Sequence, residues 1–187
     1  MRLEEVGNMI LEIGLPLLLR NVDLAYVTKA EQLLVFIAES VPFVPNVSKL
    51  SDKIGINRAT LLSYLNYLDE IGLTYNLYKD PYGISKLQKP SKVYLENTNS
   101  IFLLARNNAN IGNLRETFFS NQLRYRHTLG YTDLGDFLVD GQFTFEIWGK
   151  GKSHKQIKTV ANSYVVADNI LYGSQNKIPL WLFGFLY

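Results

Sequence analysis

The chain contains no cysteine, so neither a disulfide bond nor a cysteine-ligated zinc site can form. This composition fits a reducing compartment, and we expect a cytoplasmic protein. Uninterrupted apolar runs are short: "PLLL", "LLVFIA" and "IPLWLFGFLY" fall well below the ~20 residues that span a bilayer. The first residues also lack the charged-then-apolar order of a secretory segment. We therefore expect no membrane partner.

An excess of one charge is also lacking, because 19 Lys and Arg stand against 17 Asp and Glu in 187 residues. A formal net charge of +2 does not by itself argue for a nucleic-acid partner. What the chain does have is 47% hydrophobic residues, enough for a packed core in one large domain or two small ones.

Residues 1–45 are predicted to be helical. "EEVGNMILEIGLPLLLR" has apolar residues at helical spacing and is interrupted at 14–16 by Gly-Leu-Pro. The segment "DLAYVTKAEQLLVFIAESV" continues this spacing, and one face of its helix carries Leu33, Leu34, Ile37 and Val41. Pro42 and Pro45 are expected to end that helix.

Residues 46–107 are predicted to form a winged helix-turn-helix. A short helix at 48–54 should end at Gly55, and Asn57 should cap a longer helix that ends at Gly72. Leu61, Leu62, Leu65 and Leu68 are expected to point inward. Two strands, in "LTYNLY" and "PSKVYLEN", follow on either side of a turn region, which completes the order of a winged helix.

Residues 108–187 are predicted to form an α/β layer, so that the whole chain is of the mixed α/β class. A short helix is expected just before this part, in "SIFLLAR" at 100–106; within it, a longer helix is expected at 112–130 and a further one around "SHKQIKTVAN". The strands are expected in a hairpin at 135–152, in "SYVVAD" and in the final "IPLWLFGF". The boundary between the two parts is placed near residues 107–112, in the polar stretch "NNANIGN".

The register of the hairpin decides where its two acids lie. A two-residue turn at Asp140-Gly141 would place Asp136 and Glu146 on opposite faces. A one-residue slip puts them side by side, about 5 Å apart at Cβ, and gathers the large apolar side chains on the other face: Phe137, Val139, Phe143, Phe145 and Ile147. Burying these together at ~1.5–3 kcal/mol each outweighs the preference for one turn type, so we predict the slipped register.

Neighbouring carboxylates repel each other unless they share a cation or a proton. Mg²⁺ or Mn²⁺ accepts a pair of carboxylates together with waters, so a metal site is one interpretation of Asp136 and Glu146. The other is that both acids lie at a solvated end of the sheet.

Over nearly its whole length the chain resembles the C-terminal region of a prokaryotic AAA-type ATPase family. That region consists of a winged-helix segment and a domain similar to PD-(D/E)XK nucleases. The matching stretches are "IAESVPFVPNVSKLSDKIGINRATLLSYLNYLDEIGL", "KPSKVYLENTN", "NLRETFFSNQL", "GDFLVDGQFTFEI" and "NKIPLWLFGFLY".

The resemblance implies that Glu116, Asp136 and Glu146 occupy the acidic positions that hold the metal in active nucleases of this type. The lysine expected two residues after the last acid is replaced by Trp148, and Lys150 is the nearest substitute. The implied nuclease site is therefore expected to be impaired. His127 and His154 are not proposed as metal ligands.

The resemblance also implies an ATPase domain of the same full-length protein as a partner. No phosphate-binding loop of the G-x-x-x-x-G-K-[ST] type occurs in the chain, so we expect it to have no ATP site of its own. On this interpretation residues 1–45 are the helical segment that trails the ATPase domain.

DNA is the other expected partner. The outer side of the second helix offers Arg58, Thr60, Ser63 and Tyr64, and the predicted wing carries Lys86, Lys89 and Lys92. An alternative is that the lysines only keep strand edges solvated.

Three functions follow from the sequence. The first is a DNA-associated module of an ATPase, with weak or no cleavage. The second is an active Mg²⁺- or Mn²⁺-dependent DNA nuclease that uses Glu116, Asp136, Glu146 and Lys150. The third is a protein-interaction platform that regulates the ATPase.

Overall fold

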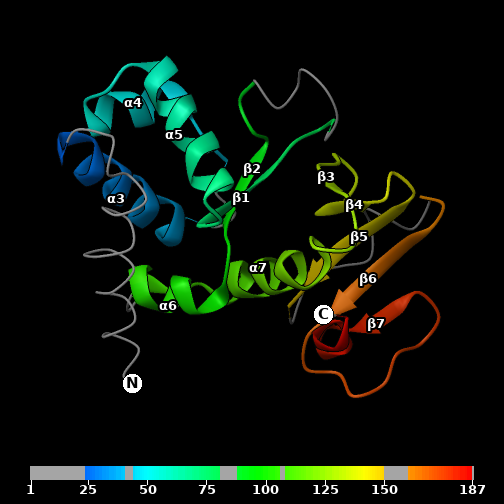
Figure 1. Ribbon diagram of the computed structural model, residues 1–187. Coiled ribbons are helices and arrows are strands. Elements are labelled where there is room, and N and C mark those ends of the chain that lie inside the picture. The colour runs from blue at the N-terminus through cyan, green and yellow to red at the C-terminus, as the bar shows by residue number, and fades with distance from the viewer. Residues whose placement is uncertain (1–23, 41–43, 81–87, 106–107, 150–159, 187) are drawn as a thin grey trace. The chain divides into compact units, whose positions relative to one another are not determined.

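A computed structural model describes residues 24–40, 44–80, 88–105, 108–149 and 160–186. The chain is of the mixed α/β class, as predicted, with a two-stranded and a five-stranded sheet among the described residues. It divides into two compact units (Figure 1). The first comprises Met1–Asn76 and Lys92–Asn110, and the second comprises Leu77–Ser91 and Ile111–Tyr187.

The first unit begins, within the described residues, with helix α3 (Leu24–Glu39). Leu33, Leu34 and Ile37 of this helix are buried, which confirms most of the predicted face, while Val41 lies outside the described residues. α3 packs against helix α6 (Thr98–Ala105), which confirms the short helix predicted there.

Helices α4 (Val47–Ile54) and α5 (Arg58–Glu70) have the ends that the sequence predicts. Gly55 adopts the left-handed conformation after α4, with φ of 73°, and its N–H donates to Ser51 O. The side chain of Asn57 accepts from the Thr60 N–H at 2.8 Å and so caps α5. The apolar face of α5 buries Leu61, Leu65 and Leu68, whereas Leu62 is only half-buried.

Strands β1 (Thr74–Leu77) and β2 (Lys92–Leu95) form the two-stranded sheet. The Ser91 N–H donates to Leu77 O and the Glu96 N–H to Leu73 O, so the strands run antiparallel. The side-chain amide of Asn76 donates to Leu65 O at 3.0 Å and ties β1 to α5. Helix, turn, helix and two strands follow in the order predicted for a winged helix-turn-helix.

The second unit contains helix α7 (Ile111–Leu123) and a five-stranded sheet of order β3-β4-β5-β6-β7. Its strands are β3 (Leu129–Gly130), β4 (Phe137–Val139), β5 (Phe143–Trp148), β6 (Ser163–Ala167) and β7 (Lys177–Pro179). Neighbours from β3 to β5 are antiparallel, and β5, β6 and β7 are parallel. Most of the helix predicted around "SHKQIKTVAN" lies outside the described residues.

Two predicted boundaries in this unit are wrong. α7 ends at Leu123 rather than near 130, because Leu129 and Gly130 pair with β4 instead. The strand predicted for "IPLWLFGF" stops at Pro179, and the 3-10 helix η4 (Leu180–Phe185) follows. Pro179 has no N–H with which to continue a sheet ladder, and at η4's three residues per turn Leu180 and Phe183 face inward.

Phe119 lies at the centre of the second unit's core and is fully buried. Its ring centroid is 5.1 Å from that of Phe137, 5.2 Å from that of Phe145 and 4.8 Å from that of Phe183. One side chain of α7 therefore contacts β4, β5 and η4, all shown in Figure 1. This packing fixes which face of the hairpin turns toward α7.

Candidate functional site

The hairpin has the slipped register that its apolar residues predict. Phe137 pairs with Phe145 and Val139 with Phe143, which leaves a three-residue loop from Asp140 to Gln142. Asp140 and Gly141 take the positive φ values, 52° and 67°, that this loop requires. The predicted register thus places Phe137, Phe143 and Phe145 on one face, although only Phe137 is fully buried there and Phe143 and Phe145 are half-buried.

Asp140 holds this loop against the segment between α7 and β3. Its carboxylate accepts from the Thr128 N–H at 2.9 Å and lies 2.7 Å from His127 Nδ1. These two hydrogen bonds, with His127 as the larger cause, hold the pKa of Asp140 below its usual value. His127 thus acts in the structure of the loop.

Asp136 lies one residue before β4, where β5 continues beyond its pairing with β4 and, among the described residues, has no further partner strand on that side. Its N–H donates to Phe145 O at 2.9 Å, and its Oδ2 accepts from the Ile147 N–H at 2.8 Å. The carboxylate therefore takes the place of a backbone carbonyl beside β5. One of its oxygens is committed to the backbone, which limits its freedom to bind a cation.

Glu146 is buried on the face of β5 that points away from Phe145. Only 4% of its surface is exposed, and its Oε2 has no hydrogen-bond partner within the part of the chain that the structure describes. Burial of a carboxylate oxygen without a partner is costly. A group in this state is suited to receive a cation.

Glu116 is buried on α7, 6% exposed, one turn before Phe119. Phe119 contacts Phe145, and side chains alternate along a strand, so α7 covers the face of β5 opposite to Glu146. Across the described ranges, no group of three or more His, Asp or Glu side chains is placed to hold a metal ion. Joint metal binding by Glu116, Asp136 and Glu146 stays a prediction, and Lys150 lies outside the described residues.

Trp148 is 6% exposed and packs with Val165, Ala167 and Ile170. The sequence does not reveal that Lys177 belongs to the same face. The parallel register places Glu146 beside Val165, and Val165 beside Lys177, so the three residues form a row across the sheet. Lys177 Nζ lies 5.6 Å from the centre of the Trp148 ring. The Lys177 ammonium on β7 thus lies near Trp148 on β5, and this placement depends on the packing of β5, β6 and β7 side by side.

A second feature missed from the sequence lies at the carboxyl ends of β5 and β6. Arg115 Nε is 2.9 Å from Asp168 Oδ2, in an ion pair that is largely buried on the arginine side. The guanidinium lies against Gly149, where a Cβ atom would collide with it. This ion pair joins α7 to the sheet next to Glu116.

Of the residues predicted to face DNA from α5, Arg58 and Ser63 are exposed and Thr60 is half-buried. Tyr64, the fourth of these residues, is half-buried, and the structure corrects the prediction that it faces outward. Its ring packs edge-on against Tyr26 of α3 at 5.8 Å, and its hydroxyl is buried without a hydrogen-bond partner among the described residues. Burial raises the pKa of Tyr64 to about 12, with a smaller contribution from Tyr26. This side chain supports the packing of α5 on α3.

The lysines predicted on the wing differ in their exposure to solvent. Lys89 is exposed and Lys86 lies outside the described residues, but Lys92 is only 8% exposed, in a strand whose residues are all buried. Lys92 is therefore not an outward phosphate ligand in this structure. Exposed Lys49 and Lys53 on α4, which were not singled out from the sequence, supply positive charge close to α5.

Comparisons of the chain with protein-family models, with curated proteins and with solved structures found no match. None of the helices in the described ranges has the length and apolar character needed to cross a bilayer.

Proposed function

We propose that the chain is a DNA-associated module that binds duplex DNA through α4 and α5. The observation that carries the proposal is the outward surface of α5. Asn57, Arg58, Ala59 and Ser63 are exposed there, and no acidic residue occurs between Asn57 and Leu68. In helix-turn-helix proteins the N-terminal residues of the second helix contact base edges in the major groove.

The charges around α5 favour this orientation. The amino-terminal end of a helix carries a partial positive charge, and Arg58 adds a full one at that end. Lys49 of α4 is exposed and suited to phosphate contacts, whereas the ammonium of Lys53, also exposed, lies 4.0 Å from the centre of the Phe36 ring of α3. Asp52 and Glu70 are exposed on the same pair of helices, so we expect a modest affinity that falls steeply with salt.

Fluorescence anisotropy with a labelled DNA duplex of about 20 base pairs tests the proposal. A recognition helix contacts about one helical turn of such a duplex. We expect Arg58→Ala to weaken binding about tenfold, since one good arginine contact contributes about 1–3 kcal/mol. The matched control is Arg126→Ala, an exposed arginine of the second unit that changes the net charge equally. Equal weakening by both substitutions would exclude α5 as the contact surface, and undetectable binding at ~50 mM salt would exclude DNA association.

For the second unit we propose a nuclease-like site with weak or no cleavage, in which Asp136 and Glu146 hold Mg²⁺ or Mn²⁺ with Glu116 in the role that the resemblance implies. Three observations favour impairment: Trp148 stands in place of the lysine, Asp136 is bonded to the backbone, and α7 covers the sheet face opposite Glu146.

The alternative is an active nuclease. The observation in its favour is that the buried Oε2 of Glu146 has no hydrogen-bond partner in the part of the chain that the structure describes. Incubation of supercoiled DNA with Mn²⁺ separates the two, with Glu146→Ala as control. Cleavage by the unaltered chain that disappears in Glu146→Ala would establish the active nuclease. Cleavage that persists in the variant would come from a contaminant.

A third function, a protein-interaction platform for an ATPase domain of the same protein, remains the alternative to DNA association. The absence of any salt-sensitive DNA affinity, together with binding to that ATPase domain in a pull-down, would favour it over the first.

A further inference from the structure

Helix η4 turns most of its side chains outward. A 3-10 helix has about three residues per turn, so its side chains fall into three rows. Leu180 and Phe183 form the buried row. The other two rows expose Trp181 (49%), Leu182 (40%) and Phe185 (72%), and Leu186 follows them at 41%. Large apolar side chains on two of three rows are unusual for a helix that packs only within its own unit.

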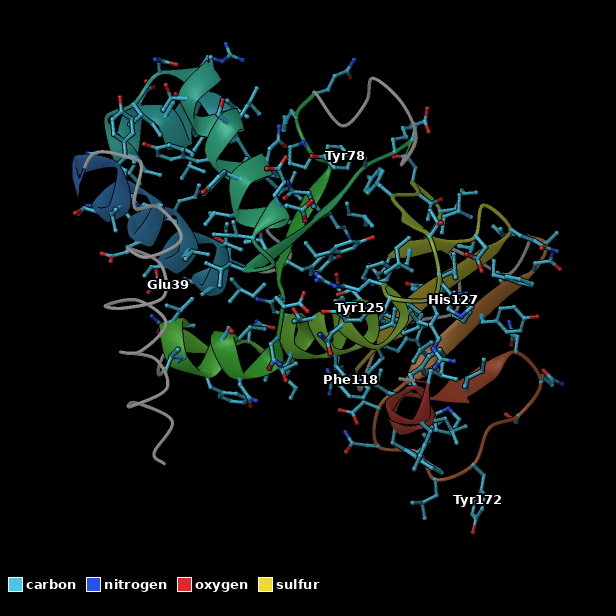
Figure 2. The ribbon with its side chains drawn as sticks, viewed as in Figure 1. Glu39, Tyr78, Phe118, Tyr125, His127 and Tyr172 are labelled. Atoms are coloured by element: carbon cyan, nitrogen blue, oxygen red, sulfur yellow. The ribbon has the colours of Figure 1, made fainter. Side chains whose placement is uncertain are left out.

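The loop between β6 and β7 extends this apolar surface. It exposes Leu171 (74%) and Tyr172 (86%), and Figure 2 shows the Tyr172 side chain pointing away from the chain. The Trp181 Nε1–H donates to Ile170 O at 3.2 Å, and a Cβ atom at Gly173 would lie 3.3 Å from Pro179 Cδ. These contacts join the loop to η4, and we call the exposed apolar residues of the two segments the η4 patch: Leu171, Tyr172, Trp181, Leu182, Phe185 and Leu186.

The size of the η4 patch is that of an interface centre. Its three aromatic side chains together expose the equivalent of about two whole side chains, which is roughly 300–500 Å². The three leucines add to this. The largest apolar patch on a typical monomer is ~300–600 Å², whereas a standard interface buries ~800 Å² per partner, including a polar rim. The η4 patch is thus large enough to be the apolar part of such an interface.

The chemistry of the η4 patch indicates what covers it. Lys177 is the only charged residue between Asn169 and Leu186, and its ammonium lies over Trp148 instead. A phosphate backbone would find no set of cations there. A second η4 patch is equally uncharged, and a two-fold axis brings one surface against itself without opposing like charges.

We propose that two copies of the chain associate through the η4 patch in an isologous homodimer. This proposal is independent of the DNA contact on α5, because no residue of the patch belongs to the first unit.

Sedimentation velocity at about 1–100 μM, the range in which a weak dimer forms, tests the proposal. We expect a concentration-dependent dimer in the unaltered chain and at least tenfold weaker association in Phe185→Glu, since association would bury a new carboxylate of each copy in an apolar interface. Tyr172→Glu is a second variant in a loop position that is 86% exposed, where a fold defect is not expected. The matched control is Leu134→Glu, an exposed leucine (52%) of the same unit outside the patch, which should leave the dimer unchanged.

Tryptophan emission provides a second readout, because burial of Trp181 on association shifts its emission to shorter wavelength as the dimer forms. A monomer throughout the concentration range would overturn the proposal and leave the patch to a different partner. A dimer that survives both Phe185→Glu and Tyr172→Glu, or one that Leu134→Glu weakens equally, would also overturn it.

Discussion

Replacement of Phe119 by alanine should show how far one side chain holds the second unit together. Phe119 is fully buried and contacts Phe137, Phe145 and Phe183 at centroid distances of 4.8–5.2 Å. Loss of a buried phenylalanine at such a junction costs about 3–5 kcal/mol. Because a domain is stable by only about 5–15 kcal/mol, this is a large fraction of the total.

Urea unfolding followed by tryptophan emission measures this loss for the second unit alone, since the two tryptophans of the chain, Trp148 and Trp181, both belong to it. With a slope of about 2 kcal/mol/M, the midpoint should fall by about 2 M. Phe118→Ala is the matched control, because Phe118 is half-buried beside Gly184 and is labelled in Figure 2. It should lose only about 1 kcal/mol. Equal losses in the two variants would refute the central position of Phe119.

Three further predictions concern the same unit. Gly149→Ala should lower the free energy of unfolding by only about 0.2–1 kcal/mol, because the new Cβ requires the guanidinium end of the Arg115 side chain to shift beside Asp168, and urea unfolding measures this. Glu146→Gln should raise thermal stability by about 1 kcal/mol, because it removes the charge from a carboxylate whose Oε2 is buried without a partner in the described residues; a lower melting temperature would contradict this. The lowered pKa of Asp140 means that the unfolded chain binds its proton more tightly, so its contribution is present above the ordinary pKa of 3.8 and is lost as the pH falls through the folded value. Urea unfolding should therefore show that Asp140→Asn has a lower free energy of unfolding than the unaltered chain at pH 7, by less than about 1 kcal/mol because this group is half-exposed. The difference should shrink as the pH falls from 7 to 3. A difference that does not change with pH would contradict the role of the Asp140 charge.

The sequence predicted the elements whose signals are local. Asn57 caps α5 and Gly55 follows α4 because a side-chain oxygen next to a free N–H, and a glycine at positive φ, act within a few residues. The hairpin register could be predicted for a related reason, because alternation along two adjacent strands fixes which side chains share a face.

Features that depend on distant partners could not be predicted in this way. The sequence of α5 alone predicts that Tyr64 points outward, but in the structure Tyr26 of α3 packs against it. The sequence places Lys92 in a strand, but it does not show that this strand, β2, is buried along its whole length. Likewise, "IPLWLFGF" has the composition of a strand, but only the end of the sheet at Pro179 leaves it free to form a 3-10 helix.

The sequence by itself determined the mixed α/β class, the two capped helices and the pairing of β4 with β5, since each depends on interactions between residues close along the chain. Only the tertiary structure decided that α7 lies on the face opposite Glu146, that Lys177 joins the row of Glu146, and that η4 exposes Trp181 and Phe185. Each of these depends on which surfaces meet when separate strands and helices pack, and packing of that kind depends on the shape and burial of all partners together rather than on any one segment.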